Sequence, residues 1–153
     1  MKRSATAVGL DVGAVYVKMV VLDGQGRAAS TVARRHHGNP VAVVHEELER
    51  LDLSGPLAIG LTGANSSLLA DLLKATPVDF VQAEIVAVRR RFPHARNILN
   101  VGGGSVTLIQ LDENGRFLDF NTNSLCAAGT GSFLDQQADR LGIRYDDLDR
   151  FGQ

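Results

Sequence analysis

The sequence predicts an α/β fold in which a mixed β-sheet is flanked by helices. The chain begins with a strand, a glycine-containing turn and a second strand, and a hairpin and a third strand complete residues 6–34. A helical segment and a further strand follow, and a strand that comes after a helix is typically parallel to the strand before it. The strand–turn–strand–hairpin–strand pattern returns at residues 96–123. We therefore predict a duplicated structure, with one lobe and the start of a second, similar lobe.

The first lobe is predicted from apolar runs separated by turn residues. ATAVGLDVG and VYVKMVVLD are strand-like and are joined by a turn at Gly13–Ala14. Asp23–Gly24 is a hairpin signal, and GRAASTVARR is predicted as the third strand. His36 and His37, which follow it, are interpreted as solvated. The next segment has apolar residues at helical spacing, namely Val41, Val44, Leu48 and Leu51.

Two further helices are predicted before the pattern repeats. PLAIGLTG is the fourth strand, and ANSSLLADLLKAT is a short helix with Asn65 or Ser66 as its N-cap. After Pro77 we expect an extended piece, VDFV, and then a helix, QAEIVAVRRRF. The three arginines that end this helix are interpreted as solvated and as favourable near the negative end of the helix dipole.

The second lobe is predicted from the same order of elements. RNILNVGG, SVTLIQLDE and RFLDFNTN are strand-like, and Asn114–Gly115 marks the hairpin. A helix is expected to begin near Thr130, with one face made of Phe133, Leu134, Ala138 and Leu141. We place the first lobe at 1–94 and the beginning of the second at 95–153. Since DDLDRFGQ resembles the opening of another element, we expect a longer protein.

Composition excludes several classes of function. The formal net charge is -1 and aromatic residues make up 5%, so neither the charge nor the stacking surface of a nucleic-acid-binding protein is present. No run approaches the ~20 apolar residues of a membrane span. A single cysteine, Cys126, excludes a disulfide framework and favours a cytoplasmic location.

Both glycine turns, LDVGAVYVK and LNVGGGSVT, lie between two strands. A tight hairpin would explain either turn, but a turn of this kind also exposes backbone N–H groups that bind phosphate oxygens. Two such turns could hold a polyphosphate from opposite sides. Asp11 lies where a carboxylate can bind Mg²⁺, and Lys18 lies within reach of a phosphate. Neither a P-loop motif nor a complete dinucleotide-binding motif occurs.

These residues resemble the actin, hexokinase and heat-shock-ATPase superfamily, and within it the activator ATPases of 2-hydroxyacyl-CoA dehydratases and benzoyl-CoA reductases. GLDVGAVYVKMVVLD is similar to the first phosphate motif, and the second glycine turn is similar to the second. LTGANSS lies where the family has a Thr-Gly-rich loop, and NSLCAAGTGSFLD is similar to the loop that supplies a cluster ligand.

The resemblance implies a cytoplasmic, two-lobed ATPase with ribonuclease-H-like (actin-like) lobes, forming a homodimer around a 4Fe–4S cluster. ATP with Mg²⁺ would drive an electron into a CoA-ester dehydratase or reductase. Asp11 would have the catalytic role, and Cys126 would be a cluster ligand, although this stretch alone is not expected to complete a cluster. The residues expected to bind nucleotide are Asp11, Gly13, Ala14, Lys18, Asn100, Gly102, Gly103, Gly104 and Ser105.

Several positions depart from the family pattern. Asn100 replaces an aspartate, and neutral residues follow Gly13 and Gly103 where the family has polar or charged ones. Because hydrolysis depends on positioned charge, these changes weaken catalysis more than the fold. Three interpretations stay open: an activator ATPase, a non-catalytic scaffold domain, and a small-molecule kinase. For the kinase neither Asp79 nor Glu84 is a convincing base.

Overall fold

The computed structural model describes residues 5–51, 57–123 and 130–144. The chain divides into two compact units, residues 1–87 and 88–153, and each is described by itself. Our expected boundary after residue 94 lies beyond the helix in which this division falls. Among the described residues, no helix is both long and apolar enough to cross a lipid bilayer.

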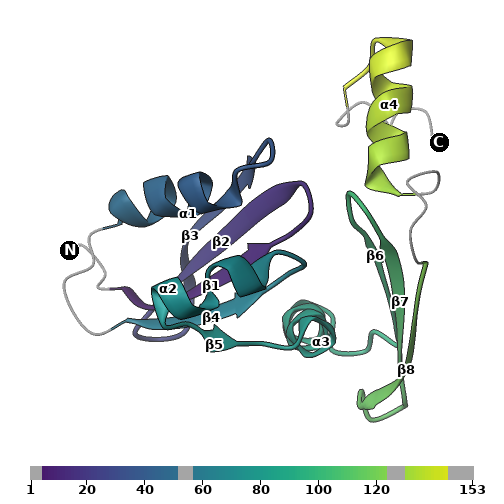
Figure 1. The fold of residues 1–153 in the computed structure, drawn as a ribbon. Helices are drawn as coiled ribbons and strands as arrows, with labels where there is room; N and C mark the ends of the chain where they lie inside the picture. Colours follow the sequence, from purple (N-terminus) through teal and green to yellow (C-terminus); the bar gives the residue numbers. More distant parts are fainter. Residues whose placement is uncertain (1–4, 52–56, 124–129, 145–153) are drawn as a thin grey trace. The chain divides into compact units, whose positions relative to one another are not determined.

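The first unit contains a five-stranded mixed sheet in the order β3-β2-β1-β4-β5 (Figure 1). β1, β2 and β3 form an antiparallel meander, and β4 and β5 extend it in parallel. The predicted meander, its turn at Gly13 and the parallel fourth strand are confirmed. The strands are β1 (Ala5–Val12), β2 (Tyr16–Asp23), β3 (Ala28–Arg35), β4 (Ala58–Thr62) and β5 (Thr76–Pro77).

Alternation along β1 and β2 gives the sheet one buried face. Pairing sets Leu10 opposite Met19, and both side chains are buried. Since neighbouring side chains in a strand point to opposite faces, Asp11 and Lys18 lie on the other face. The core of this unit consists of Val8, Leu10, Val12, Val17, Met19, Val21, Val43, Val44, Leu61 and Leu69.

Helix α1 (Pro40–Glu49) packs into this core through Val43 and Val44. Its start is well defined because the Asn39 side chain accepts a hydrogen bond from the N–H of Ala42 and a proline occupies the first helical position. Glu47, which is buried, accepts hydrogen bonds from two arginines and so ties α1 to β3.

Two predicted segments between β4 and the second unit differ in the structure. The expected helix after β4 is a 3₁₀ turn, η1 (Ser66–Leu68), followed by one turn of α-helix, α2 (Ala70–Leu73). The expected extended piece VDFV is wrong in its second half, because α3 spans Phe80–Arg91. The carboxylate of Asp79 accepts the Gln82 N–H at 2.9 Å and starts the helix there.

The second unit contains a three-stranded antiparallel sheet in the order β6-β7-β8, followed by α4. These elements are β6 (Asn97–Val101), β7 (Val106–Leu111), β8 (Phe117–Thr122) and α4 (Gly131–Leu141). The helix begins after Thr130 as predicted, and Ala138 is its buried residue, whereas the other apolar residues of its predicted face are exposed.

The hairpin between β2 and β3 and the hairpin between β7 and β8 have the same hydrogen bonds at equivalent residues. Asp23 N–H donates to Arg27 O at 2.9 Å, and Asp112 N–H donates to Arg116 O at 2.9 Å. Each hairpin has a glycine at positive φ, Gly26 at 68° and Gly115 at 72°. The prediction of a turn at Asp23–Gly24 is therefore right in place, but the glycine at positive φ is Gly26. The loop is longer than predicted because the Asp23 carboxylate accepts hydrogen bonds from the N–H groups of Gln25 and Arg27.

Arg89 at the end of α3 is not solvated as predicted. It is half-buried, and its Nη1 donates to Gly115 O at 3.1 Å. Long arginine side chains pack their stems on apolar surface while the guanidinium binds polar groups, so a run of arginines does not by itself indicate a solvated surface.

The hairpin aspartates predict acid sensitivity. The pKa of Asp23 is lowered, first by the Arg27 backbone N–H that donates to its carboxylate, against the opposing effect of burial, and the Arg116 N–H acts likewise on the pKa of Asp112. A lowered folded-state pKa stabilises the fold above the ordinary aspartate pKa of about 3.9, and this stabilisation is lost as pH falls through the lower value. Urea unfolding of D23N/D112N should therefore depend less on pH between 2 and 5 than unfolding of the native protein. Equal pH dependence would contradict this account.

Candidate functional site

The turn between β1 and β2 presents free backbone amides. Gly13 N–H donates to Tyr16 O at 2.9 Å and closes the turn. The N–H groups of Ala14 and Val15 have no hydrogen-bond partner among the residues that the structure describes. Successive free N–H groups in a turn form a concave anion-binding arrangement. Of the two residues that the sequence predicted here, Ala14 has a free N–H group, whereas the N–H group of Gly13 closes the turn.

Asp11 and Lys18 lie beside this turn on the face of the sheet opposite the core. They are register partners across β1 and β2, and Lys18 Nζ lies 3.1 Å from Asp11 Oδ2. The side chain of Lys18 is 59% exposed and that of Asp11 31%. An exposed pair contributes only about 0–1 kcal/mol, so either group can exchange its partner at little cost.

The loop after β4 packs tightly against the end of β1. Pairing of β4 with β1 sets Thr62 beside Asp11, and Asn65 N–H donates to Val12 O at 2.9 Å. Gly63 has a φ of 100°, and a Cβ there would lie 2.6 Å from Asp11 Oδ1 and from the backbone of Val12. A residue with a side chain does not fit at this position without displacing Asp11.

Two side chains that the sequence did not assign to the site converge on the Gly13 carbonyl. Asn65 Nδ2 donates to Gly13 O at 2.8 Å, and His36 Nε2 lies 3.3 Å from the same oxygen. The prediction that His36 is solvated is wrong, since it is 7% exposed. Asn65 occupies the N-cap position of η1, but its side chain makes no capping hydrogen bond. Only tertiary pairing of separate loops reveals these contacts, and no local pattern marks them.

The turn between β6 and β7 repeats the first turn. Gly102 N–H donates to Ser105 O at 2.8 Å, and within the described ranges the N–H groups of Gly103 and Gly104 have no hydrogen-bond partner. Asn100 and Thr107 are register partners, in the place that Asp11 and Lys18 have in the first turn. The second turn thus keeps the backbone geometry without the charged pair.

The beginning of α4 covers one side of this second turn. Gly131 N–H donates to Gly102 O at 2.8 Å. The hydroxyls of Thr130 and Ser132 donate to Gly103 O. A Cβ on Gly131 would approach Gly102 O to 3.1 Å, so the small residue permits this contact. The carbonyl side of the turn is therefore bound to α4, which leaves the amide side for a ligand.

The expected cluster ligand, Cys126, lies outside the described residues. Across the part of the chain that the structure describes, no three His, Cys, Asp or Glu side chains gather as a metal site. Asp11 lies next to the first glycine turn and could bind a metal ion together with a ligand.

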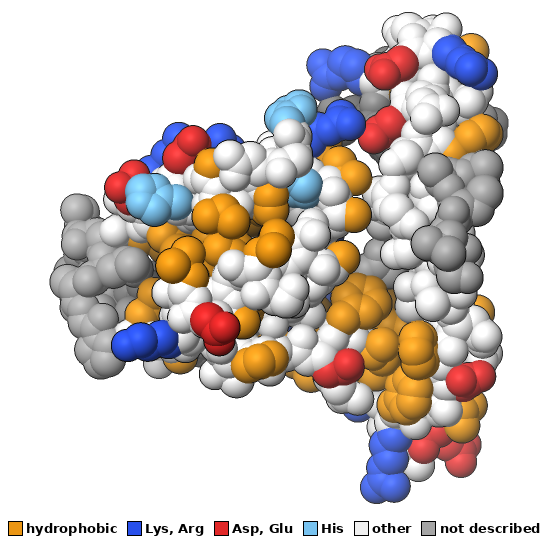
Figure 2. Space-filling model, in the orientation of Figure 1, with side chains coloured by type: hydrophobic (Ala, Val, Ile, Leu, Met, Phe, Trp, Pro, Cys, Tyr) orange, Lys and Arg blue, Asp and Glu red, His pale blue; other side chains and the backbone are white. Residues whose placement is uncertain are grey.

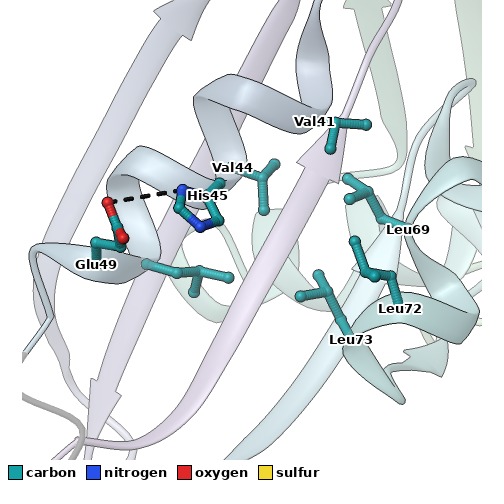
Figure 3. A pocket seen from close by; sticks show the side chains of 8 residues that line it. Val41, Val44, His45, Glu49, Leu69, Leu72 and Leu73 are labelled. Carbon is teal, nitrogen blue, oxygen red and sulfur yellow. Dashed lines mark ion pairs between the residues drawn. The ribbon is translucent and has the colours of Figure 1, made fainter.

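A cavity of about 260 Å³ lies between α1 and the η1–α2 segment, away from the predicted site residues. Its lining side chains point toward one another in Figure 3 and are mostly apolar, apart from the ion pair between His45 and Glu49 at 3.6 Å. Figure 2 shows hydrophobic side chains gathered at the surface of this unit. The cavity lacks convergent polar groups, so it is not the candidate site. It is lined by Val41, Val44, His45, Leu48, Glu49, Leu69, Leu72 and Leu73.

The mixed α/β fold and its two glycine turns agree with the architecture that the sequence predicted. The chain belongs to the BadF/BadG/BcrA/BcrD ATPase family, whose sequence profile matches residues 8–153. The predicted family resemblance is confirmed.

Three relatives are an activator, an activating ATPase and a subunit of CoA-ester enzymes. The chain is 27% identical to the 2-hydroxyisocaproyl-CoA dehydratase activator of Clostridioides difficile, over 92% of this chain and 54% of the relative. It is 29% identical to the (R)-2-hydroxyglutaryl-CoA dehydratase activating ATPase of Acidaminococcus fermentans, over 97% and 58%. It is 26% identical to a benzoyl-CoA reductase subunit of Thauera aromatica, over 92% and 52%. The chain thus spans about half the length of these relatives.

Solved structures agree with this assignment. The Clostridium difficile activator of 2-hydroxyisocaproyl-CoA dehydratase, which has ADPNP bound, matches with a TM-score of 0.76 and 26% identity over 93% of this chain and 54% of that one. The Acidaminococcus fermentans (R)-2-hydroxyglutaryl-CoA dehydratase component A matches in fold, with a TM-score of 0.75 and 23% identity over 97% and 59%.

The packing of Gly63 gives a stability prediction. Replacing it with alanine places a side chain at positive φ and against the backbone of Val12, so Gly63→Ala should lower the free energy of unfolding by about 2–4 kcal/mol. Gly24→Ala is the control, because its Cβ would meet only Thr6 Cγ2 at 3.7 Å, and its effect should stay within about 0.5 kcal/mol. Hydrogen exchange of the β1 amides measures both, and equal effects would refute the close packing.

Proposed function

We propose that each glycine turn of this chain is a binding site for phosphate groups of ATP, and that the chain serves as part of an ATP-dependent activator of a CoA-ester dehydratase or reductase. One observation carries the proposal: the same turn occurs twice, with free N–H groups at Ala14 and Val15 in the first unit and at Gly103 and Gly104 in the second. Family membership supports ATP as the ligand.

The residues of both turns fit a phosphate group. Among the residues with free N–H groups, Ala14 and Gly104 are exposed, and Val15 and Gly103 are half-buried. Backbone amides bind phosphate oxygens without needing a charged side chain. A phosphate group must approach the backbone closely, and Ala14, Gly103 and Gly104 are small enough to permit this approach.

Asp11 and Lys18 supply the charges. When nucleotide binds, Lys18 exchanges the Asp11 carboxylate for a phosphate oxygen, and the carboxylate becomes available to Mg²⁺ or to its water ligands. Because the exposed ion pair is weak, little stability is lost in this exchange. The metal ion, when bound, neutralises charge that develops on the phosphates.

The remaining parts of the proposal concern the complete assembly. The partner is a CoA-ester dehydratase or reductase component, and the activator is a cytoplasmic homodimer with two similar lobes. ATP hydrolysis is coupled to electron transfer through a 4Fe–4S cluster with Cys126 as a ligand. These points rest on the family resemblance, and the functions of the relatives support the class of partner.

A second candidate is a non-catalytic nucleotide-binding or scaffold domain. It is favoured by the neutral pair Asn100 and Thr107, which stands where the first turn has a carboxylate and an ammonium group. Thr107 is buried and hydrogen-bonds to Thr122, so it is not available to position an attacking water. Catalysis, more than binding, depends on such groups.

We predict that Asp11→Asn weakens binding of Mg-ATP by about ten-fold, because the variant loses one charged metal contact. Binding of ATP in EDTA should be unchanged or tighter, since the variant removes a negative charge near the phosphates. Calorimetric titration of the native protein and the variant measures both affinities.

The matched control is Asp71→Asn, which changes an exposed carboxylate on α2 and should leave both affinities unchanged. Absence of Mg-ATP binding to the native protein would overturn the nucleotide proposal. An equal loss for Asp11→Asn with and without Mg²⁺ would overturn the metal role alone.

We predict that Asn100→Asp raises the rate of Mg-ATP hydrolysis by the native protein, because it adds a carboxylate where the family pattern has one. Phosphate release over time measures the rate, with Asn121→Asp on β8 as a control for added charge. No change in hydrolysis would favour the scaffold function.

A further inference from the structure

We infer that His36 and Asn65 are positioning residues that orient the Gly13–Ala14 peptide toward the nucleotide phosphates. The inference rests on the proposed function and adds two residues to it. Neither residue lies in β1, β2 or the turn itself: His36 follows β3, and Asn65 follows β4.

The carbonyl oxygen of Gly13 is approached by two side-chain nitrogens. A carbonyl oxygen has two lone pairs, and here Asn65 Nδ2 at 2.8 Å and His36 Nε2 at 3.3 Å approach the same oxygen. Both groups act on one peptide from separate loops. This peptide is therefore held by side chains, in addition to the Gly13 N–H that closes the turn on Tyr16 O.

Holding this carbonyl fixes the direction of an amide. The peptide group is planar and trans, so the C=O of Gly13 and the N–H of Ala14 point in opposite directions. That N–H is one of the free amides of the turn, since no described residue accepts its hydrogen bond. The two donors thus direct the Ala14 N–H away from themselves and toward the position of a ligand.

The environment of His36 fixes which of its nitrogens donates. Gly38 N–H donates to His36 Nδ1 at 3.1 Å, so Nδ1 is the acceptor and Nε2 carries the proton that Gly13 O accepts. The residue is 7% exposed, and the backbone N–H of His36 donates to Val15 O at 3.1 Å. A buried ring with both nitrogens engaged has a single orientation.

The environment of Asn65 is equally specific. Its backbone N–H donates to Val12 O at 2.9 Å, which places the residue, and its side chain makes no cap to η1. The side-chain amide is therefore not needed to start the helical turn, and it donates to Gly13 O instead.

The second unit supports this assignment independently. The equivalent carbonyl, Gly102 O, accepts the Gly131 N–H at 2.8 Å from the start of α4. In both turns, then, a donor from a distant loop or helix holds the carbonyl that precedes the free amides, although the donors differ in kind. A hairpin turn needs no such donor, whereas a turn that binds a ligand through its amides gains pre-organisation from it.

The test separates positioning from loop structure with paired variants. His36→Gln keeps a nitrogen donor near the position of Nε2 but loses the acceptor for Gly38, and His36→Asn keeps an acceptor near Nδ1 but loses the donor to Gly13. Asn65→Ala removes the other donor and keeps the backbone bond to Val12. Asn39→Ala, which removes the cap of α1, is the control for a loss of stability alone.

Two readouts are measured on the native protein and each variant: the ¹⁵N order parameter of the Ala14 amide without ligand, and the affinity for Mg-ATP by calorimetry. We expect His36→Asn and Asn65→Ala to lower the order parameter and to weaken Mg-ATP binding by roughly five-fold each, the typical effect of one hydrogen bond. His36→Gln and Asn39→Ala should keep the native affinity. The double variant should lose more than the product of the single losses, because each single variant keeps one donor that still restrains the carbonyl in part.

An unchanged Ala14 order parameter in both His36→Asn and Asn65→Ala would overturn the inference, as would equal losses of affinity for His36→Gln and His36→Asn. A lowered order parameter in a protein that binds no Mg-ATP would support the positioning of the peptide and refute the proposed nucleotide function. The two failures are therefore distinguishable.

Discussion

The pairing register of β1 and β2 is the constraint on which the first unit depends. It sets Leu10 opposite Met19 in the core and Asp11 opposite Lys18 on the other face. A slip by one residue would expose the apolar row and bury the charged pair, so the burial of the core side chains also fixes the site. The turn at Gly13 lies at the end of the same two strands. Core packing thus sets the position of both the charged pair and the free amides.

The second meander shows which part of this arrangement is retained when the chemistry changes. The turn hydrogen bond from Gly102 to Ser105 and the hairpin closed by Asp112 match those at Gly13 and Asp23. At the charged pair, by contrast, Asn100 and Thr107 are neutral. The turn hydrogen bonds are common to both meanders, whereas the register pairs differ in charge and in surroundings: Lys18 is exposed and Thr107 is buried. The same turn therefore occurs twice, with a charged register pair in the first unit and a neutral one in the second.

The features that could be predicted from the sequence are those that depend on local sequence pattern. Period-two alternation and turn residues located the strands, and Gly13, Asp11 and Lys18 were assigned to one end of a sheet because they lie within a single hairpin. His36 was missed because adjacent histidines carry no local signal of burial, and its partner is a carbonyl in another loop. Asn65 was interpreted as a helix cap because asparagine commonly caps helices, whereas tertiary contact recruits its amide to Gly13. Arg89 was misread for the same reason, since its partner Gly115 lies in a hairpin further along the chain.

Recognition by backbone amides explains why binding and catalysis can diverge in this chain. An amide N–H is present at every residue except proline, so the replacement of hydroxyl residues by Ala14 and Val15 leaves the donors of the first turn in place. The peptide orientation is then the property that must be kept, and it is kept by groups outside the turn: Asn65 in the first unit and Gly131 in the second. For hydrolysis, backbone groups cannot replace lost side chains, because the positioned charges that catalysis needs come from side chains. A chain with intact turns and one remaining charged pair is therefore expected to retain affinity for nucleotide while its rate of hydrolysis is low.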